Sequence, residues 1–322
     1  MEWAMLGMIF MAGIILIVKG GDWFVDAASW IAEVSGIPKL IVGATIVSLA
    51  TTLPEMLVSA MAASQGKVDM AVGNAVGSVT ANLGLIMAIS VICMPVAIRR
   101  GDYLVKALLM LTAAGVLVWG GGKGEVGLTL SLPLMLIFAV FTYENLHSAR
   151  RAMRFSGPGD LGPLCTATPR KRAIFLQCVK FSVGAIAVVI GADLLVDSSS
   201  AMARLAGVSE RIIGVTIVAV GTSLPELVTT VTAIAKRQSA LSVGNILGAN
   251  ILDLTLILPL SALISRQPLP VSTASAVIDL PACLLVGAIA VIPAIVTARF
   301  RRWQGIALLA VYAGYLLITC GA

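Results

Sequence analysis

Long apolar runs separated by short polar connections dominate this chain. Because a helix needs roughly 20 apolar residues to cross a bilayer, the runs predict ten membrane-spanning helices. Gly and Pro inside several runs do not exclude them, since membrane helices tolerate both. The predicted spans are residues 3–19, 38–63, 70–94, 102–120, 126–146, 173–195, 210–235, 241–264, 274–297 and 304–320. A long polar connection, residues 147–172, separates two groups of five spans.

Composition supports a multi-pass integral membrane protein. Of the 322 residues, 59% are hydrophobic and 12% are charged, whereas a soluble protein carries about a quarter charged residues. The net charge of +6 does not indicate nucleic-acid binding, because the basic residues lie in connections between apolar runs. With the N-terminus outside, seventeen of the 22 Lys and Arg residues fall on the inner side. The positive-inside rule therefore places both termini outside and the 147–172 linker in the cytoplasm.

An internal repeat is the clearest pattern in the sequence. Residues 43–55 read GATIVSLATTLPE and residues 214–226 read GVTIVAVGTSLPE; both are followed by a V-G-N-x-x-G motif at the same offset of 171 residues. Equivalent positions are five spans apart, so the second copy crosses the membrane in the opposite direction. Inverted repeats with broken helices are typical of secondary transporters. The predicted fold is all-α, with inverted repeats at 1–146 and 173–322 and broken helices at spans 2 and 7.

Each LPE motif places a glutamate within an apolar run, Glu55 in the first repeat and Glu226 in the second. The preceding proline lacks an N–H, which leaves nearby carbonyls, such as those of Thr51 and Thr222, without helical donors. Two carboxylates with backbone carbonyls form a hard-oxygen ligand set suited to Ca²⁺. Alternatively, each glutamate faces water at a helix end or pairs with a buried Lys. We disfavour this interpretation, because the facing segments contain no Lys or Arg and burying a carboxylate costs several kcal/mol.

The V-G-N-x-x-G motifs predict a polar strip on each third helix of the repeats. Residues four apart share one helix face, which groups Asn74, Ser78 and Asn82 in the first copy, and Asn245, Ala249 and Asp253 in the second. Small-residue spacing alone is more often simple helix packing. Its recurrence beside both LPE motifs favours a role in the ion site.

A weaker pairing relates Asp22 and Asp26 to Asp193 and Asp197 at the same offset. These residues are expected at the ends of spans 1 and 6, either as solvated helix ends or as an ion-access face. No HExxH, GxSxG or phosphate-binding loop is present, so an enzyme is not expected. Neither a cofactor nor an obligate protein partner is expected. The expected partners are the transported ions and the lipid bilayer.

With both motifs in each repeat and the ten-span layout, the chain resembles the sodium/calcium exchanger family of the calcium/cation antiporter superfamily. The short linker is typical of a compact prokaryotic member, which implies a cell (inner) membrane location. The resemblance implies that spans 2, 3, 7 and 8 form the ion core, and that spans 1 and 6 slide across it to give alternating access.

The resemblance also implies individual roles. Ca²⁺ is expected at Glu55, Glu226 and the carbonyls of Thr51 and Thr222, with Asn82 and Asp253 as the polar position of each third helix. Na⁺ is expected at the hydroxyls of Thr52, Ser78 and Ser223 and at the carbonyls of Ser48 and Ala219. Ala249 departs from the family pattern, because it lacks the hydroxyl expected there. The sodium position on the second-repeat side is therefore expected to be weak, absent or completed by water.

The function expected is Ca²⁺/Na⁺ antiport, with two alternatives. Crowding of carboxylates favours their protonated forms, so a proton/calcium exchanger is the first alternative, and Ala249 strengthens it. A passive cation channel is the second. Buried, paired and symmetric carboxylates favour an exchanger over a channel.

Overall fold

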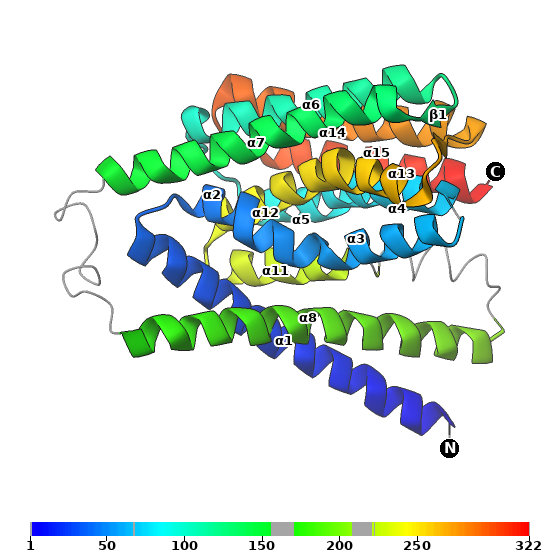
Figure 1. The fold of residues 1–322 in the computed structure, drawn as a ribbon. Helices are drawn as coiled ribbons and strands as arrows, with labels where there is room; N and C mark the ends of the chain where they lie inside the picture. The colour runs from blue at the N-terminus through cyan, green and yellow to red at the C-terminus, as the bar shows by residue number, and fades with distance from the viewer. Residues whose placement is uncertain (1, 67, 156–170, 208–220, 222, 322) are drawn as a thin grey trace.

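The computed structural model describes residues 2–66, 68–155, 171–207, 221 and 223–321. Within them the chain is almost entirely helical (Figure 1), with several short π-helical segments, labelled η. The elements are α1 (Glu2–Ser35), α2 (Lys39–Val42), η1 (Gly43–Val47), α3 (Ser48–Ser64), α4 (Val68–Ala81), η2 (Asn82–Met87), α5 (Ala88–Cys93), α6 (Arg100–Gly121), β1 (Glu125–Val126), α7 (Leu128–Phe155), α8 (Lys171–Leu205), α11 (Leu224–Ala235), α12 (Ser239–Leu252), η5 (Asp253–Ile257), α13 (Leu258–Ser265), β2 (Leu269–Pro270), η6 (Ser275–Asp279), α14 (Leu280–Thr297) and α15 (Arg302–Gly321).

Eight helices in the described part of the chain are long and apolar enough to cross a membrane. They correspond to eight of the ten predicted spans. The predicted span at 304–320 coincides with α15, and the one at 210–235 is described only in its last part, as α11. The two termini lie at one end of the helical bundle, and the ends of α7 and α8 that flank residues 156–170 lie at the other (Figure 1).

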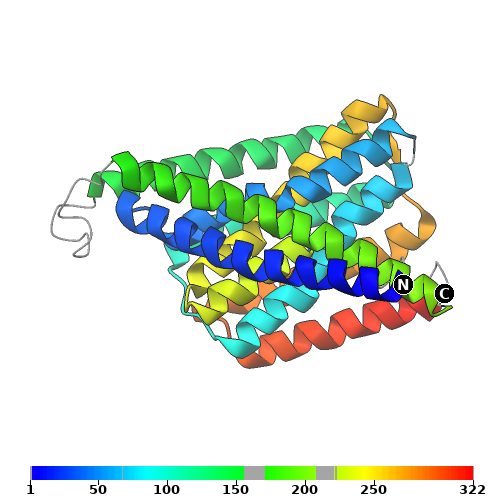
Figure 2. The same cartoon turned by 90° about the horizontal axis from the view of Figure 1, so that it is seen from below.

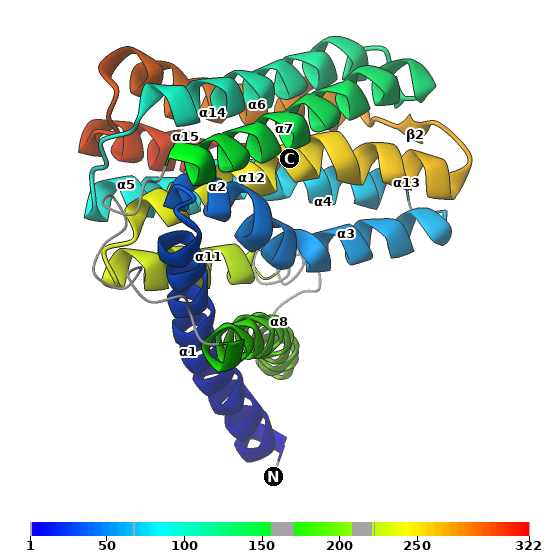
Figure 3. The same cartoon turned by 60° about the vertical axis from the view of Figure 1, so that its left-hand side comes forward.

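Helices α1 and α8 form a layer of their own against one face of the molecule, where they cross side by side (Figures 1 and 2). Their backbones approach closely at glycines. A Cβ built on Gly20 would lie 2.9 Å from the carbonyl oxygen of Gly184, and one on Gly191 would lie 2.9 Å from that of Gly13. Small residues at such a crossing allow backbone-to-backbone packing within a membrane. The pair contacts the remaining helices mainly through α11 (Figure 3).

The interior is organised around α12, in which every residue from Leu241 to Leu252 is buried. It packs tightly against α2 and η1. A Cβ on Gly43 would lie 2.3 Å from the carbonyl oxygen of Leu241, and one on Gly244 would lie 2.1 Å from that of Leu40. Only glycine permits this approach, which brings the first repeat motif against the second.

Three boundaries differ from those expected. Helix α1 extends to Ser35 rather than to residue 19, so Asp22 and Asp26 lie inside it and not at its end. Helix α8 extends to Leu205, which likewise puts Asp193 and Asp197 within a helix. Helix α7 continues to Phe155, beyond the predicted linker start at residue 147. These helices extend beyond the apolar runs from which the spans were predicted, because a helix can continue past its membrane-spanning part.

The predicted break in span 2 is also wrong as an interruption, because the chain is helical from Lys39 to Ser64 and Pro54 lies inside α3. The irregularity is instead the π-helical segment η1 (Gly43–Val47), which lies before Pro54 in the same continuous helix. There the Thr45 hydroxyl donates a 2.7 Å hydrogen bond to the carbonyl of Ile41. Side chains that satisfy freed backbone groups in this way allow proline and π turns within membrane helices. The predicted break in span 7 lies largely outside the described residues.

Candidate ion-binding site

Glu55 projects from the middle of α3 into the protein interior. Its side chain is 1% exposed, and Ser48, Thr51 and Thr52 on the same helix are also buried. Because Pro54 has no N–H, the carbonyl of Ala50, four residues earlier, loses its usual helical donor. One stretch of α3 therefore carries a buried carboxylate, three buried hydroxyls and a backbone carbonyl without its helical donor.

Glu226 lies in the first turn of α11, with Ser223 at the N-cap and Pro225 in the first turn. Its side chain is also 1% exposed, and Ser223 is buried. The partial positive charge of a helix N-terminus favours a carboxylate at this position. The predicted ligands Thr222 and Ala219 lie outside the described residues.

Asn82 and Asp253 each begin a π-helical segment, η2 and η5 respectively. Both side chains are buried, as is Ser78 one turn before Asn82. Single π-helical turns are frequent at functional sites, because they turn side chains away from the α-helical register. The two segments begin at positions that the repeat offset equates, 82 and 253. No residue pattern there predicted π-helical geometry.

The three acidic side chains from α3, α11 and η5 are close together. The carboxyl of Glu55 is near enough to Glu226 and Asp253 for electrostatic repulsion, and Thr51 and Thr52 lie beside Glu226. Both carboxylate oxygens of Glu55, both of Asp253 and Oε2 of Glu226 are buried without a hydrogen-bond partner among the described residues. Such groups are rare and expensive in native proteins.

Neutral oxygens around the carboxylates are also buried without a hydrogen-bond partner among the described residues. The hydroxyls of Thr52 and Ser223 and the side-chain carbonyl Oδ1 of Asn82 are buried and also lack a partner. Within the described ranges, no three His, Cys, Asp or Glu side chains are arranged so that they alone could hold a metal ion. A bound cation would therefore need mixed ligation by carboxylate, hydroxyl, amide and carbonyl oxygens, the set that Ca²⁺ prefers.

A hydrogen-bonded framework of amides holds these helices in register. Asn74 Nδ2 donates to Ser59 Oγ at 2.9 Å and to the carbonyl of Glu55 at 3.3 Å. In the second motif, Asn245 Nδ2 donates to Thr229 Oγ1 at 3.1 Å, while its Oδ1 accepts from the Thr51 hydroxyl at 3.2 Å. Asn74 and Asn245 thus tie each third helix to a glutamate-bearing helix.

A further contact orients Asn82. Its Nδ2 donates to Asn250 Oδ1 at 3.1 Å, while its own Oδ1 has no partner among the residues that the structure describes. Asn250, Thr229 and Ser59 were not among the residues predicted for the site. The sequence signal for Asn250 was present in the Gly-Ala-Asn stretch, but its partner could be identified only from the packing of α12 against η2.

Asp22 and Asp26 do not join the carboxylate cluster. They pair with Lys236 at the end of α11, whose Nζ lies 3.1 Å from Asp22 Oδ1 and 2.8 Å from Asp26 Oδ1. Lys236 also donates to the carbonyl of Asp22 at 2.9 Å. A small cavity nearby, where α1 and α8 meet α3 and α11, is lined by Phe24, Thr51 and Pro225 among others. The α1/α8 layer therefore lies directly against the helices that carry the glutamates.

Comparison with known proteins agrees with this architecture. The family model for the sodium/calcium exchanger protein matches residues 5–146 and 177–321. The sodium/calcium exchanger MaX1 of Methanosarcina acetivorans is 29% identical, with 97% of each chain covered. An uncharacterized membrane protein of Methanocaldococcus jannaschii is 30% identical, with 94% of each chain covered. A solved structure of the sodium-calcium exchanger NCX_Mj, soaked with Na⁺ and Sr²⁺, is similar with a TM-score of 0.81 at 28% identity, covering 99% of both chains.

Proposed function

The chain belongs to the sodium/calcium exchanger family, and we propose that it exchanges Ca²⁺ for Na⁺ at the buried cluster formed by Glu55, Glu226 and Asp253. One observation carries the assignment of the site. Five carboxylate oxygens of these three residues lie buried inside membrane-length helices without a hydrogen-bond partner among the described residues. An ionised carboxylate in such a place requires a compensating cation.

Ca²⁺ fits the cluster because it accepts six to eight oxygen ligands in flexible geometry. Glu55, Glu226 and Asp253 supply charge, and Asn82 supplies an amide oxygen that its bond to Asn250 leaves free. The carbonyl of Thr51 and that of Thr222 complete the proposed calcium ligands.

Na⁺ is proposed to bind the same cavity through neutral oxygens beside the carboxylates. Thr52 and Ser223 present buried hydroxyls that have no hydrogen-bond partner in the described part of the chain. Ser78, together with the carbonyls of Ser48 and Ala219, completes the proposed set. Both ions need the same glutamates, so the cavity does not hold a full complement of each. An empty cavity leaves mutually repelling carboxylates buried, which disfavours a conformational change without ions and makes exchange obligatory.

We also propose that residues 1–146 and 173–322 form two inverted repeats joined by the cytoplasmic linker. The glycines at the α1/α8 crossing support this arrangement. Gly13 and Gly20 map by the 171-residue offset to Gly184 and Gly191, and Gly20 faces Gly184 while Gly13 faces Gly191. Exchanging the repeats converts one contact into the other, as a pseudo-two-fold axis requires.

In this proposal α1 and α8 are the mobile pair that slides across the ion-binding helices. Their separate layer and their glycine-to-glycine contact are consistent with movement as one unit (Figure 2). We also propose that both termini lie outside the cell membrane and the 147–172 connection in the cytoplasm, which the distribution of Lys and Arg supports.

The test is calcium uptake into vesicles reconstituted with the purified chain. Vesicles loaded with Na⁺ should take up Ca²⁺, and vesicles loaded with choline at the same pH should not. Glu55→Gln and Glu226→Gln should each abolish uptake. Near-normal uptake by Glu226→Gln would refute the site. Uptake driven by a pH gradient without Na⁺ would instead identify protons as the counter-ion, and uptake without any counter-ion would identify a channel.

A further inference from the structure

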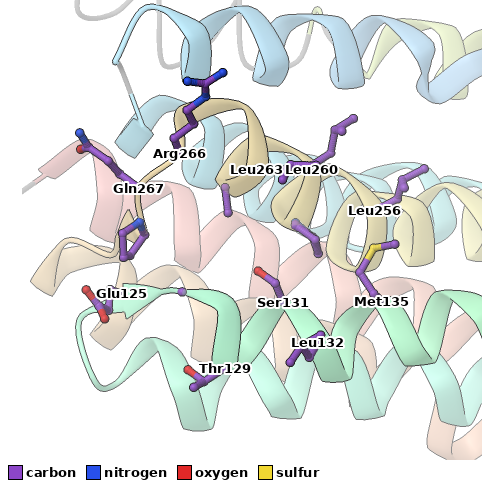
Figure 4. A pocket seen from close by; sticks show the side chains of 14 residues that line it. Glu125, Thr129, Ser131, Leu132, Met135, Leu256, Leu260, Leu263, Arg266 and Gln267 are labelled. Carbon is purple, nitrogen blue, oxygen red and sulfur yellow. The ribbon is translucent and has the colours of Figure 1, made fainter.

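A second binding site is formed by a groove between α7 and α13, separate from the carboxylate cluster. It has a volume of about 620 Å³. Its walls are almost entirely apolar and include Leu132 and Met135 of α7 and Leu260 and Leu263 of α13 (Figure 4). Leu256 of η5 closes one end of this apolar surface.

The groove opens toward lipid rather than toward water. Leu132 and Leu263 along its rim are 70% and 72% exposed. In helices that cross a membrane, leucines exposed to this degree face hydrocarbon. Three small residues, Gly127, Ser131 and Ala262, are among those that line the groove. The apolar part of the groove therefore suits an apolar chain.

One end of the groove is polar and carries both signs of charge. Glu125, Arg266 and Gln267 line that end, with Arg266 and Glu125 on opposite sides of it (Figure 4). Neither Glu125 nor Arg266 forms an ion pair with another described residue. Their loops are joined by the β1–β2 pairing and by a 2.8 Å bond from Val271 N to the carbonyl of Gly124. The two opposite charges are thus held at one mouth without neutralising each other.

A buried polar atom lies between the charged mouth and the apolar walls. The hydroxyl of Ser131 is 7% exposed at the residue level and has no hydrogen-bond partner in the described part of the chain. A donor in this position is expensive unless something accepts its proton. From its charged end inward, the groove thus offers two opposite charges, then the Ser131 hydroxyl without a partner, and then the apolar walls.

We propose that this groove binds a phospholipid whose headgroup combines a phosphate with a primary ammonium. Arg266 binds the phosphate through charge-assisted hydrogen bonds, and Glu125 accepts from the ammonium. Ser131 donates to an ester carbonyl, and an acyl chain lies along the leucines. A glycerol headgroup would offer Glu125 only neutral hydroxyls, which form weaker hydrogen bonds to a carboxylate than an ammonium does, and a quaternary ammonium has no N–H to donate.

The test is native mass spectrometry of the purified full chain titrated with phosphatidylethanolamine, phosphatidylcholine or phosphatidylglycerol. The ethanolamine lipid should bind most tightly. Arg266→Asn should weaken its binding about tenfold, the range of a hydrogen bond to a charged group, and asparagine tolerates the left-handed backbone there. Arg237→Asn is the matched control, because Arg237 is an exposed arginine with the same left-handed backbone, φ 56° against 54°, at the end of a different helix.

Two further variants separate the headgroup from the groove. Glu125→Gln should remove the preference for ethanolamine over glycerol headgroups without weakening phosphate binding. Ala262→Trp should fill the groove and exclude all three lipids. Equal binding of the ethanolamine lipid by wild type and Arg266→Asn would overturn the proposal, as would tighter wild-type binding of phosphatidylglycerol.

Discussion

Glu226→Gln should separate the stability of the empty protein from its response to Ca²⁺. The substitution keeps the shape of the side chain, so it creates no cavity, but it removes one of three clustered carboxylates. The new amide can donate to a neighbouring carboxylate. Since each unsatisfied buried polar group costs roughly 1–3 kcal/mol, the ion-free variant should be more stable than wild type by an amount in that range.

The response to Ca²⁺ should change in the opposite direction. A ligand at 100 times its dissociation constant stabilises a protein by about 2.7 kcal/mol. Wild type should gain this amount, whereas the variant, with one charged ligand removed, should gain little at the same concentration. The assay is thermal unfolding of the purified protein in detergent, without ions and across a Ca²⁺ titration.

Glu33→Gln provides the control, because Glu33 is an exposed glutamate that pairs with Lys39 at the surface. Its calcium response should equal that of wild type. If Ca²⁺ stabilises Glu226→Gln as much as it stabilises wild type, Glu226 is not a ligand. If the ion-free variant is less stable than wild type, a partner stabilises the Glu226 carboxylate in the empty protein.

Three other substitutions test the packing and the asymmetry of the site. Gly244→Ala should lower the unfolding free energy by about 1–3 kcal/mol, because its Cβ would meet the Leu40 carbonyl, whereas Gly7→Ala, with no atom within 4 Å, should not; thermal unfolding measures both. Lys236→Met should shift the equilibrium between conformations by at most about 1 kcal/mol, the value of a partly exposed ion pair, and spin-label distances between α1 and α11 would detect it. Ala249→Ser restores a hydroxyl beside Asp253 and should steepen the Na⁺ dependence of calcium exchange in vesicles.

Sequence alone predicted the eight long apolar helices of the described chain and the three acidic residues proposed for the site, because both depend on local composition and on the 171-residue repeat. Glu55, Glu226 and Asp253 are conspicuous wherever an apolar run surrounds them. The π-helical segments at Asn82 and Asp253 could not be predicted, because no side chain encodes that register locally. They depend on how η2 and η5 pack against neighbouring helices.

Contacts between distant helices were the other features beyond sequence reasoning. The bond from Asn82 to Asn250 spans 168 positions and the ion pair from Lys236 to Asp22 spans 214. Each joins residues that look unremarkable in their own segments. The ends of α1 and α8 were misplaced for a related reason, since charged residues such as Asp22 are tolerated within a helix once a partner on another helix compensates them.

The ion pair of Lys236 also bears on how the two states of an alternating-access cycle compare. In a perfectly inverted pair of repeats, a two-fold rotation would convert the inward-facing state into the outward-facing state, and the two would have equal free energies. The repeat offset equates Lys236 with Gln65, which has no charge to offer the aspartates of α8. Lys236 of the second repeat therefore pairs with Asp22 and Asp26 of α1. The equivalent Gln65 of the first repeat cannot form such an ion pair with α8. The state that preserves the contact should be favoured in the absence of ions, and high ionic strength, which screens exposed pairs, should reduce that preference.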